Sequence, residues 1–450
     1  MNFIIKKETG LKLLEQFMGN KEVRSSFIYL FSSIAGTGVA FFLVPILTRY
    51  LTPHDYGIVS NYTAIFTIAS YFVSLSCIGY VFRNHFFLNN DENKKSISNT
   101  FFVNIAMTLV TFFLLLIFSG IIKKELEIPI GWLLIIPFIS ICQVIIDITL
   151  SFYQAKKRAK EYSMFQILQT IMNLGLSVIL VALFLWNWEG RIMALLISSF
   201  IVAAIGIILL VKNRLINFSL KLVDKKNIKD FLNFGIPLIP HSIGGFVLVL
   251  SDRFFLSSMV SVSAAGLYSV GFTFGGLLMI LHGAFHKVFM PYAFENLSKT
   301  KDSDEVKSKL VKITYMYITF FIICSVGLYF VAKTIFPFFV GEKFQDAYVY
   351  VLWIALGYAM LAAYQMFGIY VIYTKKTKMV AFRTDFLAAL IKLPLTYFLI
   401  KTVGPIGAAQ ATFVAYLITA ISAWHINNKA YPMPWFSFAG RKEKLIEAVK

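Results

Sequence analysis

The chain has 450 residues, of which 58% are hydrophobic and 14% charged, and its mean hydropathy is +0.73. So much apolar surface excludes a soluble globular domain and predicts a membrane protein. The net charge of +19 would suit nucleic acid, but the Lys and Arg residues lie in short gaps between apolar stretches, where anionic membrane lipids are the expected partner.

Residues 1–24 have no apolar signal-peptide core, and Leu11, Leu14 and Phe17 form one apolar face beside lysines, which predicts a short amphipathic interfacial helix. Apolar stretches of about 20 residues then recur, the length that crosses a hydrocarbon core of about 30 Å. The alternating segments of a strand barrel are absent. The sequence therefore predicts an all-α membrane protein with twelve spans, at 25–48, 57–82, 98–120, 130–152, 163–186, 191–211, 233–257, 264–290, 309–332, 347–373, 380–401 and 405–426.

The cations alternate between rich and poor gaps. Of the 42 Lys and Arg residues, 33 fall at the two termini and in or beside alternate gaps, and eight fall in or beside the gaps between those. The positive-inside rule then places both termini in the cytoplasm, including a tail at 427–450. The one remaining cation, Lys392, lies near the middle of a predicted span. A charge there is expensive, so it is a candidate functional residue.

The two halves of the sequence resemble each other. When Lys156 is aligned with Lys375, three pairs of polar residues coincide, each set on one helix face: Gln166 with Asp385, Asn173 with Lys392, and Ser177 with Thr396. Tyr56-Gly-Ile-Val-Ser60 likewise resembles Ala265-Gly-Leu-Tyr-Ser269. We expect two six-helix lobes, 25–211 and 233–426, related by a parallel pseudo-two-fold repeat and joined by a basic cytoplasmic linker at 212–232.

Lys392 has three candidate partners: Asp385 on its own span, Asp147 on the fourth span, and an anionic substrate. Asp147 belongs to a polar stripe that either packs against another helix or faces water. We expect both ionisable residues to face a hydrated cavity, with a structural Lys–Asp pair as the alternative.

Other polar residues lie near span ends. Arg49, Asp252 and Arg253 lie at the outer ends of the first and seventh spans, where they either extend to the interface or serve function. His241 follows a proline-rich break that permits bending.

The sequence contains no G-x-x-x-x-G-K-[ST], H-E-x-x-H or G-x-S-x-G motif, so we expect a transporter rather than an enzyme, without a cofactor. The three cysteines lie inside apolar segments, which implies no disulfide framework. His282 and His286 form an i, i+4 pair without a third metal ligand nearby in sequence, so no metal site is expected.

Two stretches resemble bacterial polysaccharide (O-antigen type) flippases of the multidrug/oligosaccharidyl-lipid/polysaccharide exporter superfamily. The first runs from Ser32-Ser-Ile-Ala-Gly36 to Pro45-Ile-Leu-Thr-Arg49-Tyr-Leu-Thr-Pro-His-Asp55-Tyr-Gly57. The second comprises Phe234-Gly-Ile-Pro-Leu-Ile-Pro-His241, Ser251-Asp-Arg-Phe-Phe255 and Ala265-Gly-Leu-Tyr-Ser269. The related peptidoglycan-precursor flippases usually have fourteen spans, which the expected count of twelve disfavours.

The resemblance implies a lipid-linked oligosaccharide substrate on undecaprenyl pyrophosphate, two lobes that rock in the bacterial inner (cytoplasmic) membrane, and coupling to protons or sodium. A polysaccharide polymerase and chain-length proteins are the protein partners that it implies. By matching motif, functional importance extends to Arg49, Asp252 and Arg253. From the polar stripes we expect Lys392, Asn173 and Thr396 to bind substrate with the two arginines. Asp147, Asp252, Asp385 and His241 would serve coupling or gating. The alternatives are a drug or metabolite cation antiporter with an acidic cavity, and a membrane scaffold without transport.

Overall fold

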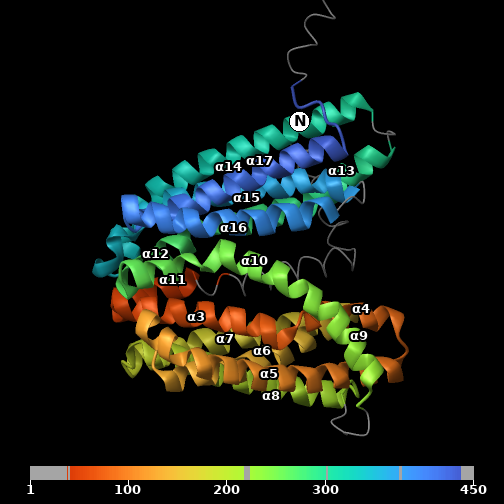
Figure 1. Cartoon of the computed structure of the whole chain (residues 1–450), viewed down its shortest axis with the longest axis vertical. Helices are drawn as coiled ribbons and strands as arrows, with labels where there is room; N and C mark the ends of the chain where they lie inside the picture. Colours follow the sequence, from red (N-terminus) through yellow and green to blue (C-terminus); the bar gives the residue numbers. More distant parts are fainter. Residues whose placement is uncertain (1–37, 39–40, 217–222, 300–302, 374–377, 437–450) are drawn as a thin grey trace, which may run out of the picture. The chain divides into compact units, whose positions relative to one another are not determined.

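The computed structural model describes residue 38 and residues 41–216, 223–299, 303–373 and 378–436, apart from the side chains of 284, 371 and 378–387. In these ranges every regular element is a helix, and most are long (Figure 1). In chain order they are a short helix at Phe41–Tyr50, then α3 (Pro53–Ser74), α4 (Cys77–Phe87), α5 (Asn90–Leu126), α6 (Ile130–Ala155), α7 (Ala159–Val178) with a π turn (Ile179–Leu183), α8 (Asn187–Lys212), α9 (Lys225–Gly235), a 3₁₀ turn (Ile236–Leu238), α10 (Ile239–Leu250), α11 (Asp252–Met259), α12 (Val262–Gly275), α13 (Leu277–Lys299), α14 (Asp304–Phe339), a 3₁₀ turn (Glu342–Ala347), α15 (Tyr348–Tyr373), α16 (Lys378–Val403) and α17 (Ile406–Ala430).

Ten helices in the described part are long and apolar enough to cross a membrane. The predicted membrane fold is therefore confirmed, and each of the ten overlaps a predicted span. The predicted span at 25–48 lies mostly outside the described residues, and α16 at 380–401 is described in part as backbone only. The count of twelve and the repeat stay predictions.

The longest helices extend beyond the predicted spans because polar caps lengthen them. At the start of α5, Asn89 accepts a hydrogen bond from the Glu92 backbone, and the Glu92 side chain caps Asn89 in return. This capping box satisfies two backbone N–H groups that a bare helix end would leave unpaired. Lys123 and Lys124 lie in the last turn of α5, where their positive charges complement the negative end of the helix dipole.

The chain divides into two compact units. Unit 1 comprises Met1–Leu51 and Tyr62–Ile239, and unit 2 comprises Thr52–Asn61 and Pro240–Lys450. Helix α3 therefore contributes its first turns to unit 2 and its remainder to unit 1. The predicted boundaries of the lobes and of the linker at 212–232 stay predictions, and the predicted interfacial helix at 1–24 lies outside the described residues.

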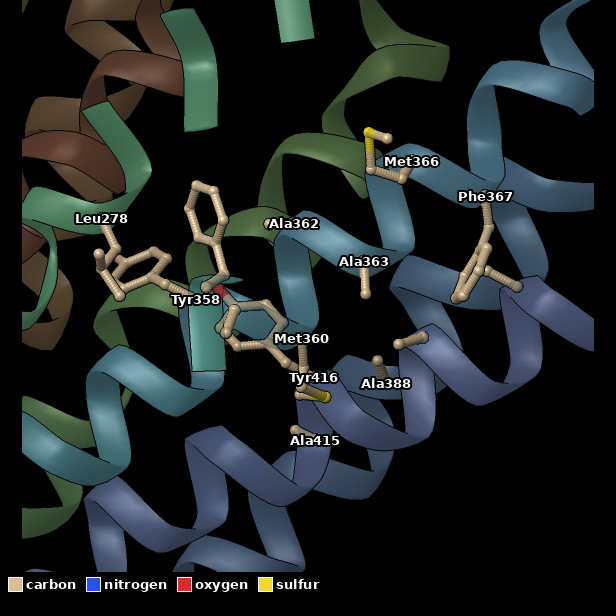
Figure 2. Close-up of a cluster of buried hydrophobic side chains, with 14 of the residues drawn as sticks. Leu278, Tyr358, Met360, Ala362, Ala363, Met366, Phe367, Ala388, Ala415 and Tyr416 are labelled. Atoms are coloured by element: carbon tan, nitrogen blue, oxygen red, sulfur yellow. The ribbon is translucent and has the colours of Figure 1, made fainter. Parts of the chain in front are cut away.

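Each unit has its own apolar core. In unit 2, α15 is the central helix and packs against α14 and α17. Figure 2 shows part of this core, to which Ala362 and Ala363 of α15, Ala388 of α16 and Ala415 of α17 belong. Small side chains let membrane helices approach closely, which compensates for the lack of a hydrophobic driving force between helices in lipid.

In unit 1, α3 and α4 are separate helices because the chain turns between them. Leu75 and Ser76 adopt positive φ angles of 46° and 57°. The carbonyl oxygen of Leu75 lies so close to α9 that a Cβ atom added to Gly235 would come within 2.3 Å of it. Only glycine permits this approach, which fixes α9 against the junction of α3 and α4.

Candidate functional site

A carboxylate lies at the centre of unit 2, where α10 ends and α11 begins. Asp252 is the first residue of α11, and its side chain is 0% exposed. An ionised carboxylate only accepts hydrogen bonds, and its two oxygens have about four lone pairs, so about four donors are needed to satisfy it when it is buried. The structure supplies donors from α12, α16 and α17.

The strongest of these donors is Lys392 of α16. Its Nζ lies 2.8 Å from Asp252 Oδ2, and it also donates to the backbone carbonyl of Leu248. The two side chains are 1% and 0% exposed, so this ion pair is fully withdrawn from solvent in the structure. Burial of a charge is tolerated only with such pairing, because desolvation of either ion alone costs several kcal/mol.

Three hydroxyl groups complete the surroundings of Asp252. Tyr268 OH donates to Oδ2 at 2.6 Å and Thr412 Oγ1 donates to the same oxygen at 2.9 Å. Thr396, one helical turn after Lys392, reaches Oδ1 at 3.5 Å. We call Asp252, Lys392, Tyr268, Thr396 and Thr412 the buried polar cluster. It joins α11, α12, α16 and α17 through one carboxylate.

The next residue, Arg253, is also buried but has different contacts. Its Nε donates to Ser60 Oγ at 2.7 Å, and its Nη1 donates to the Val249 carbonyl at 3.1 Å. The guanidinium lies 4.8 Å from the centre of the Phe272 ring, a cation–π contact that stabilises a weakly hydrated cation. Arg253 therefore ties the first turns of α3 to α10 and α12 within unit 2.

The two sequence stretches that resemble each other are in contact. Ser60 Oγ lies 2.6 Å from Ser269 Oγ, at equivalent places in Gly57-Ile-Val-Ser60 and Gly266-Leu-Tyr-Ser269. A Cβ added to Gly57 would come within 2.0 Å of the Val262 carbonyl oxygen, and one added to Gly266 within 2.0 Å of that of Pro53. The paired glycines thus let α3 and α12 cross backbone to backbone.

In unit 1, Asp147 of α6 lies at one end of a chain of amides. Gln143 Nε2 donates to Asp147 Oδ1 at 2.9 Å, Gln169 Nε2 donates to Gln143 Oε1 at 3.2 Å, and Gln166 Nε2 donates to Gln169 Oε1 at 3.4 Å. The described part shows no ion pair to this carboxylate. Lys392, for which Asp147 is one of three candidate partners from the sequence, pairs with Asp252.

Asn173, which aligns with Lys392 in the sequence repeat, has neutral surroundings in unit 1. Its Nδ2 donates to Ser198 Oγ at 3.3 Å. One turn later, Ser177 accepts a hydrogen bond from Arg191 Nη1 at 3.1 Å. The two aligned stripes thus share positions in the sequence but have different hydrogen-bond partners.

The remaining predicted residues are Arg49, His241 and Asp385. Arg49 is exposed in the short helix at Phe41–Tyr50, and His241 is exposed near the start of α10. Asp385 belongs to α16, but its side chain lies outside the described residues. The predicted roles of these three residues in transport stay predictions.

The His282 and His286 pair is not part of a metal-ligand group, since the described residues contain no cluster of three or more His, Cys, Asp or Glu. His282 is 1% exposed and lies between two polar partners: Nδ1 is 2.5 Å from Tyr317 OH and Nε2 is 2.6 Å from Gln365 Oε1. Because the amide oxygen of Gln365 only accepts, Nε2 carries the proton in the neutral ring and Nδ1 accepts from Tyr317. This geometry is that of a structural histidine.

Sequence reasoning missed three features of the cluster: the pairing of Lys392 with Asp252, and the contributions of Tyr268 and Thr412. Asp252 was placed at a span end, where an aspartate ordinarily reaches water. The sequence marks Asp252 as a candidate counter-charge, because it is an acidic residue between apolar segments, but it does not show which helix packs beside Lys392. The structure places Lys392 in an ion pair withdrawn from solvent, whereas the sequence favours a hydrated cavity.

The chain is similar to a known protein family and to a known membrane protein. Residues 23–297 match the family described as "Polysaccharide biosynthesis protein". An uncharacterized membrane protein of Haemophilus influenzae is 27% identical over 363 residues, which cover 80% of this chain and 86% of that protein.

Two solved structures share the fold. A lipid II flippase, MurJ, in an inward closed conformation has a TM-score of 0.69 at 16% identity, with 90% of this chain and 87% of that chain covered. An inward-facing multidrug resistance transporter of the MATE family has a TM-score of 0.58 at 12% identity, with 90% and 94% covered. At these identities the likeness establishes the transporter-like fold alone.

Proposed function

Because the chain belongs to the polysaccharide biosynthesis protein family, we propose that it is a flippase for lipid-linked oligosaccharides. The substrate would be an oligosaccharide repeat unit on undecaprenyl pyrophosphate, moved from the cytoplasmic to the periplasmic leaflet of the bacterial inner membrane by alternating access. Both termini would be cytoplasmic. The observation that carries this proposal is the family match over residues 23–297, which joins polysaccharide biosynthesis to a chain with membrane-spanning helices.

The buried polar cluster supplies a mechanism for such a flippase. Lys392 has its charge balanced by Asp252 in the structure, and a pyrophosphate is the kind of anion that could take the place of that carboxylate. The ammonium would then offset the desolvation of the substrate's negative charge where water is scarce. Hydroxyl and amide side chains, such as Thr396 of α16 and Asn173 of α7, would hydrogen-bond the sugar.

The same exchange gives a place for ion coupling. When Lys392 turns to the substrate, Asp252 becomes a buried carboxylate without its cation, and uptake of a proton or a sodium ion would restore neutrality. The three hydroxyls that face Asp252 are oxygen ligands suited to a sodium ion and hydrogen-bond partners suited to a protonated carboxyl. Charge balance thus links substrate binding and ion binding in the proposed cycle.

The test is complementation in a strain that lacks the gene. Loss of the gene should cause undecaprenyl-linked repeat units to accumulate on the cytoplasmic side and should abolish the surface polysaccharide. Wild-type protein and Lys392→Arg should restore the polysaccharide, whereas Lys392→Glu should not. Normal surface polysaccharide in the deletion strain would refute the flippase proposal, and full rescue by Lys392→Glu would remove this residue from the mechanism.

A second candidate, a cation antiporter, is favoured by the surroundings of Asp147. This carboxylate is hydrogen-bonded to an amide and has no ion pair in the described part of unit 1, which suits a residue that binds and releases a cation. The discriminating measurement is drug susceptibility. An antiporter gene, when deleted, should sensitise cells to cationic drugs and leave surface polysaccharide intact, the opposite of the flippase result.

The polymerase and chain-length proteins that use flipped repeat units would be functional partners under the main proposal. Co-purification of those proteins with the tagged full-length chain from native membranes would test physical association.

A further inference from the structure

A polar pocket of about 530 Å³ lies within unit 1. It is formed by α4 and the residue that follows it, by the first turns of α5, and by α9 with its N-cap. Its lining contains four cations, three carboxylates and three amides but only one aliphatic side chain: Tyr80, Arg83, Asn84, Leu88, Glu92, Lys95, Asp224, Lys226, Asn227, Lys229, Asp230 and Asn233. A pocket for an apolar ligand would have the reverse composition.

The helices present this polar lining because their apolar faces pack elsewhere. On α9, the lining residues Lys226, Lys229 and Asn233 recur at helical spacing, while Phe231 on the other side is fully buried. Tyr80 of α4 lies with its ring centre 5.1 Å from that of Phe231, and its hydroxyl donates to Asp230 at 2.9 Å. The pocket is therefore a fixed feature of the α4–α9 packing rather than a gap between loose side chains.

The carboxylates of the pocket already have donors. Asp224 accepts from the Lys226 backbone and forms an ion pair with Lys95 at 3.0 Å. Asp230 accepts from Tyr80, and Glu92 caps the backbone of Asn89.

Three cations of the pocket are different. Among the residues that the structure describes, Arg83, Lys226 and Lys229 form no ion pair with a carboxylate. Arg83 contacts only neutral groups, Asn84 at 3.2 Å and the Phe87 ring at 4.9 Å. The lining therefore offers three cations and several amides to a ligand, a set that matches a phosphate ester.

The edge of the pocket is apolar and exposed. Phe87, which stacks on Arg83, is 73% exposed, and its neighbour Phe86 is 59% exposed. Aromatic side chains beside a cation at the end of a membrane helix are typical of the depth where lipid headgroups meet acyl chains. A soluble phosphate compound would leave this apolar edge unused, whereas a lipid would cover it.

We propose that the pocket between α4, α5 and α9 binds the phosphate group of an anionic membrane lipid, with the hydrocarbon chain of the lipid against Phe86 and Phe87. Arg83, Lys226 and Lys229 are the phosphate ligands, and Asn227 and Asn233 bind the polar remainder of the headgroup. The ligand chemistry is shared by acidic phospholipids and by polyprenyl diphosphates. The inference does not depend on the proposed transport function.

The experiment uses the full-length protein, purified and placed in phosphatidylcholine nanodiscs. Retention of added phosphatidylglycerol, of a polyprenyl diphosphate, and of soluble pyrophosphate is measured by native mass spectrometry. The triple variant Arg83→Gln/Lys226→Gln/Lys229→Gln should bind the lipid phosphates at least about tenfold more weakly than wild type, since each cation near a membrane surface contributes about 1 kcal/mol toward anionic lipid.

The control variant Lys123→Gln/Lys124→Gln/Lys333→Gln removes the same charge at exposed positions outside the pocket and should bind like wild type. Equal loss in both variants would mean diffuse surface charge and would overturn the pocket. Soluble pyrophosphate binding as tightly as either lipid would overturn the lipid assignment.

Two further measurements on wild-type protein keep the proposal testable if the triple variant fails to fold. Raising the salt concentration should release the bound lipid, because exposed charge contacts are screened. A fatty acid should compete poorly, because a carboxylate offers the three cations fewer oxygens than a phosphate. Salt-insensitive binding, or displacement by fatty acid at equal concentration, would refute a phosphate site. Preference for phosphatidylglycerol or for the polyprenyl diphosphate identifies which lipid supplies the phosphate.

Discussion

The pairing of Lys392 with Asp252 leads to the most informative prediction. Lys392→Met keeps much of the volume of the side chain and removes its charge, leaving Asp252 buried without its cation. Loss of one partner of a buried ion pair costs about 3–5 kcal/mol. Tyr268, Thr396 and Thr412 still donate to the carboxylate, so we expect a loss near the lower limit, about 3 kcal/mol.

The assay is thermal unfolding of the purified protein in detergent. At about 2–4 °C per kcal/mol for domains of a few hundred residues, Lys392→Met should lower the Tm by about 6–12 °C. Lys401→Met is the matched control, because it is the same substitution at an exposed position of the same helix, and its Tm should stay near that of wild type. A Tm for Lys392→Met within error of this control would refute the reasoning.

A second variant separates stability from function. Lys392→Met/Asp252→Asn removes both charges, so that no unpaired charge is left buried. The double variant should therefore regain most of the lost Tm. If Lys392 also binds substrate, the double variant is stable but does not restore surface polysaccharide. Restored polysaccharide would show that the pair has a structural role alone.

Three further predictions concern other parts of the chain. Gly57→Ala and Gly266→Ala each place a Cβ within 2.0 Å of a carbonyl oxygen, so each should lower the Tm through about 1–3 kcal/mol of overpacking. The control Gly120→Ala, with nothing within 4 Å, should raise the Tm slightly. A Tm change in the same direction for all three variants would contradict the crossing of α3 and α12. Asp147→Asn keeps an oxygen that can accept from Gln143, so the Tm should change little, and unchanged ion-dependent transport in vesicles would exclude Asp147 as a coupling residue. The hydrogen bond from Lys95 lowers the pKa of Asp224, so the stability that this carboxylate contributes is present above its unfolded pKa and is lost as the pH falls through the lowered folded value. The small Tm advantage of wild type over Asp224→Asn should therefore vanish in acid, and an advantage that persists below that pH would contradict this assignment.

The membrane fold could be predicted from the sequence because hydrophobic length is a direct consequence of bilayer thickness. The helices at 130–155 and 406–430 lie within a few residues of the predicted spans 130–152 and 405–426. The ends of α5 could not be predicted as well, because a polar capping box extends a helix into residues that hydropathy counts as loop.

The sequence predicts several residues of the buried polar cluster, but it does not predict which of them contact one another. Lys392 was selected because a charge in hydrocarbon is expensive, and Thr396 because it shares a helix face with it. The partner of Lys392 depends on which helix packs beside α16, and a single sequence holds no such information. The resemblance between Tyr56–Ser60 and Ala265–Ser269 was visible in the sequence, yet nothing in the pattern indicated that the two segments would touch.

The long helices α5 and α14 have a consequence for the fit of the protein in its membrane. With 37 and 36 residues they are each about 55 Å long at a rise of 1.5 Å per residue, well beyond the roughly 40–45 Å of a bilayer with its headgroups. Each unit therefore contains a helix that is longer than the full thickness of the bilayer. The turns at both ends of α5 and at the start of α14 carry polar and charged residues. A thicker bilayer can therefore be accommodated by sinking these turns into the headgroups, which makes the chain tolerant of variation in membrane thickness.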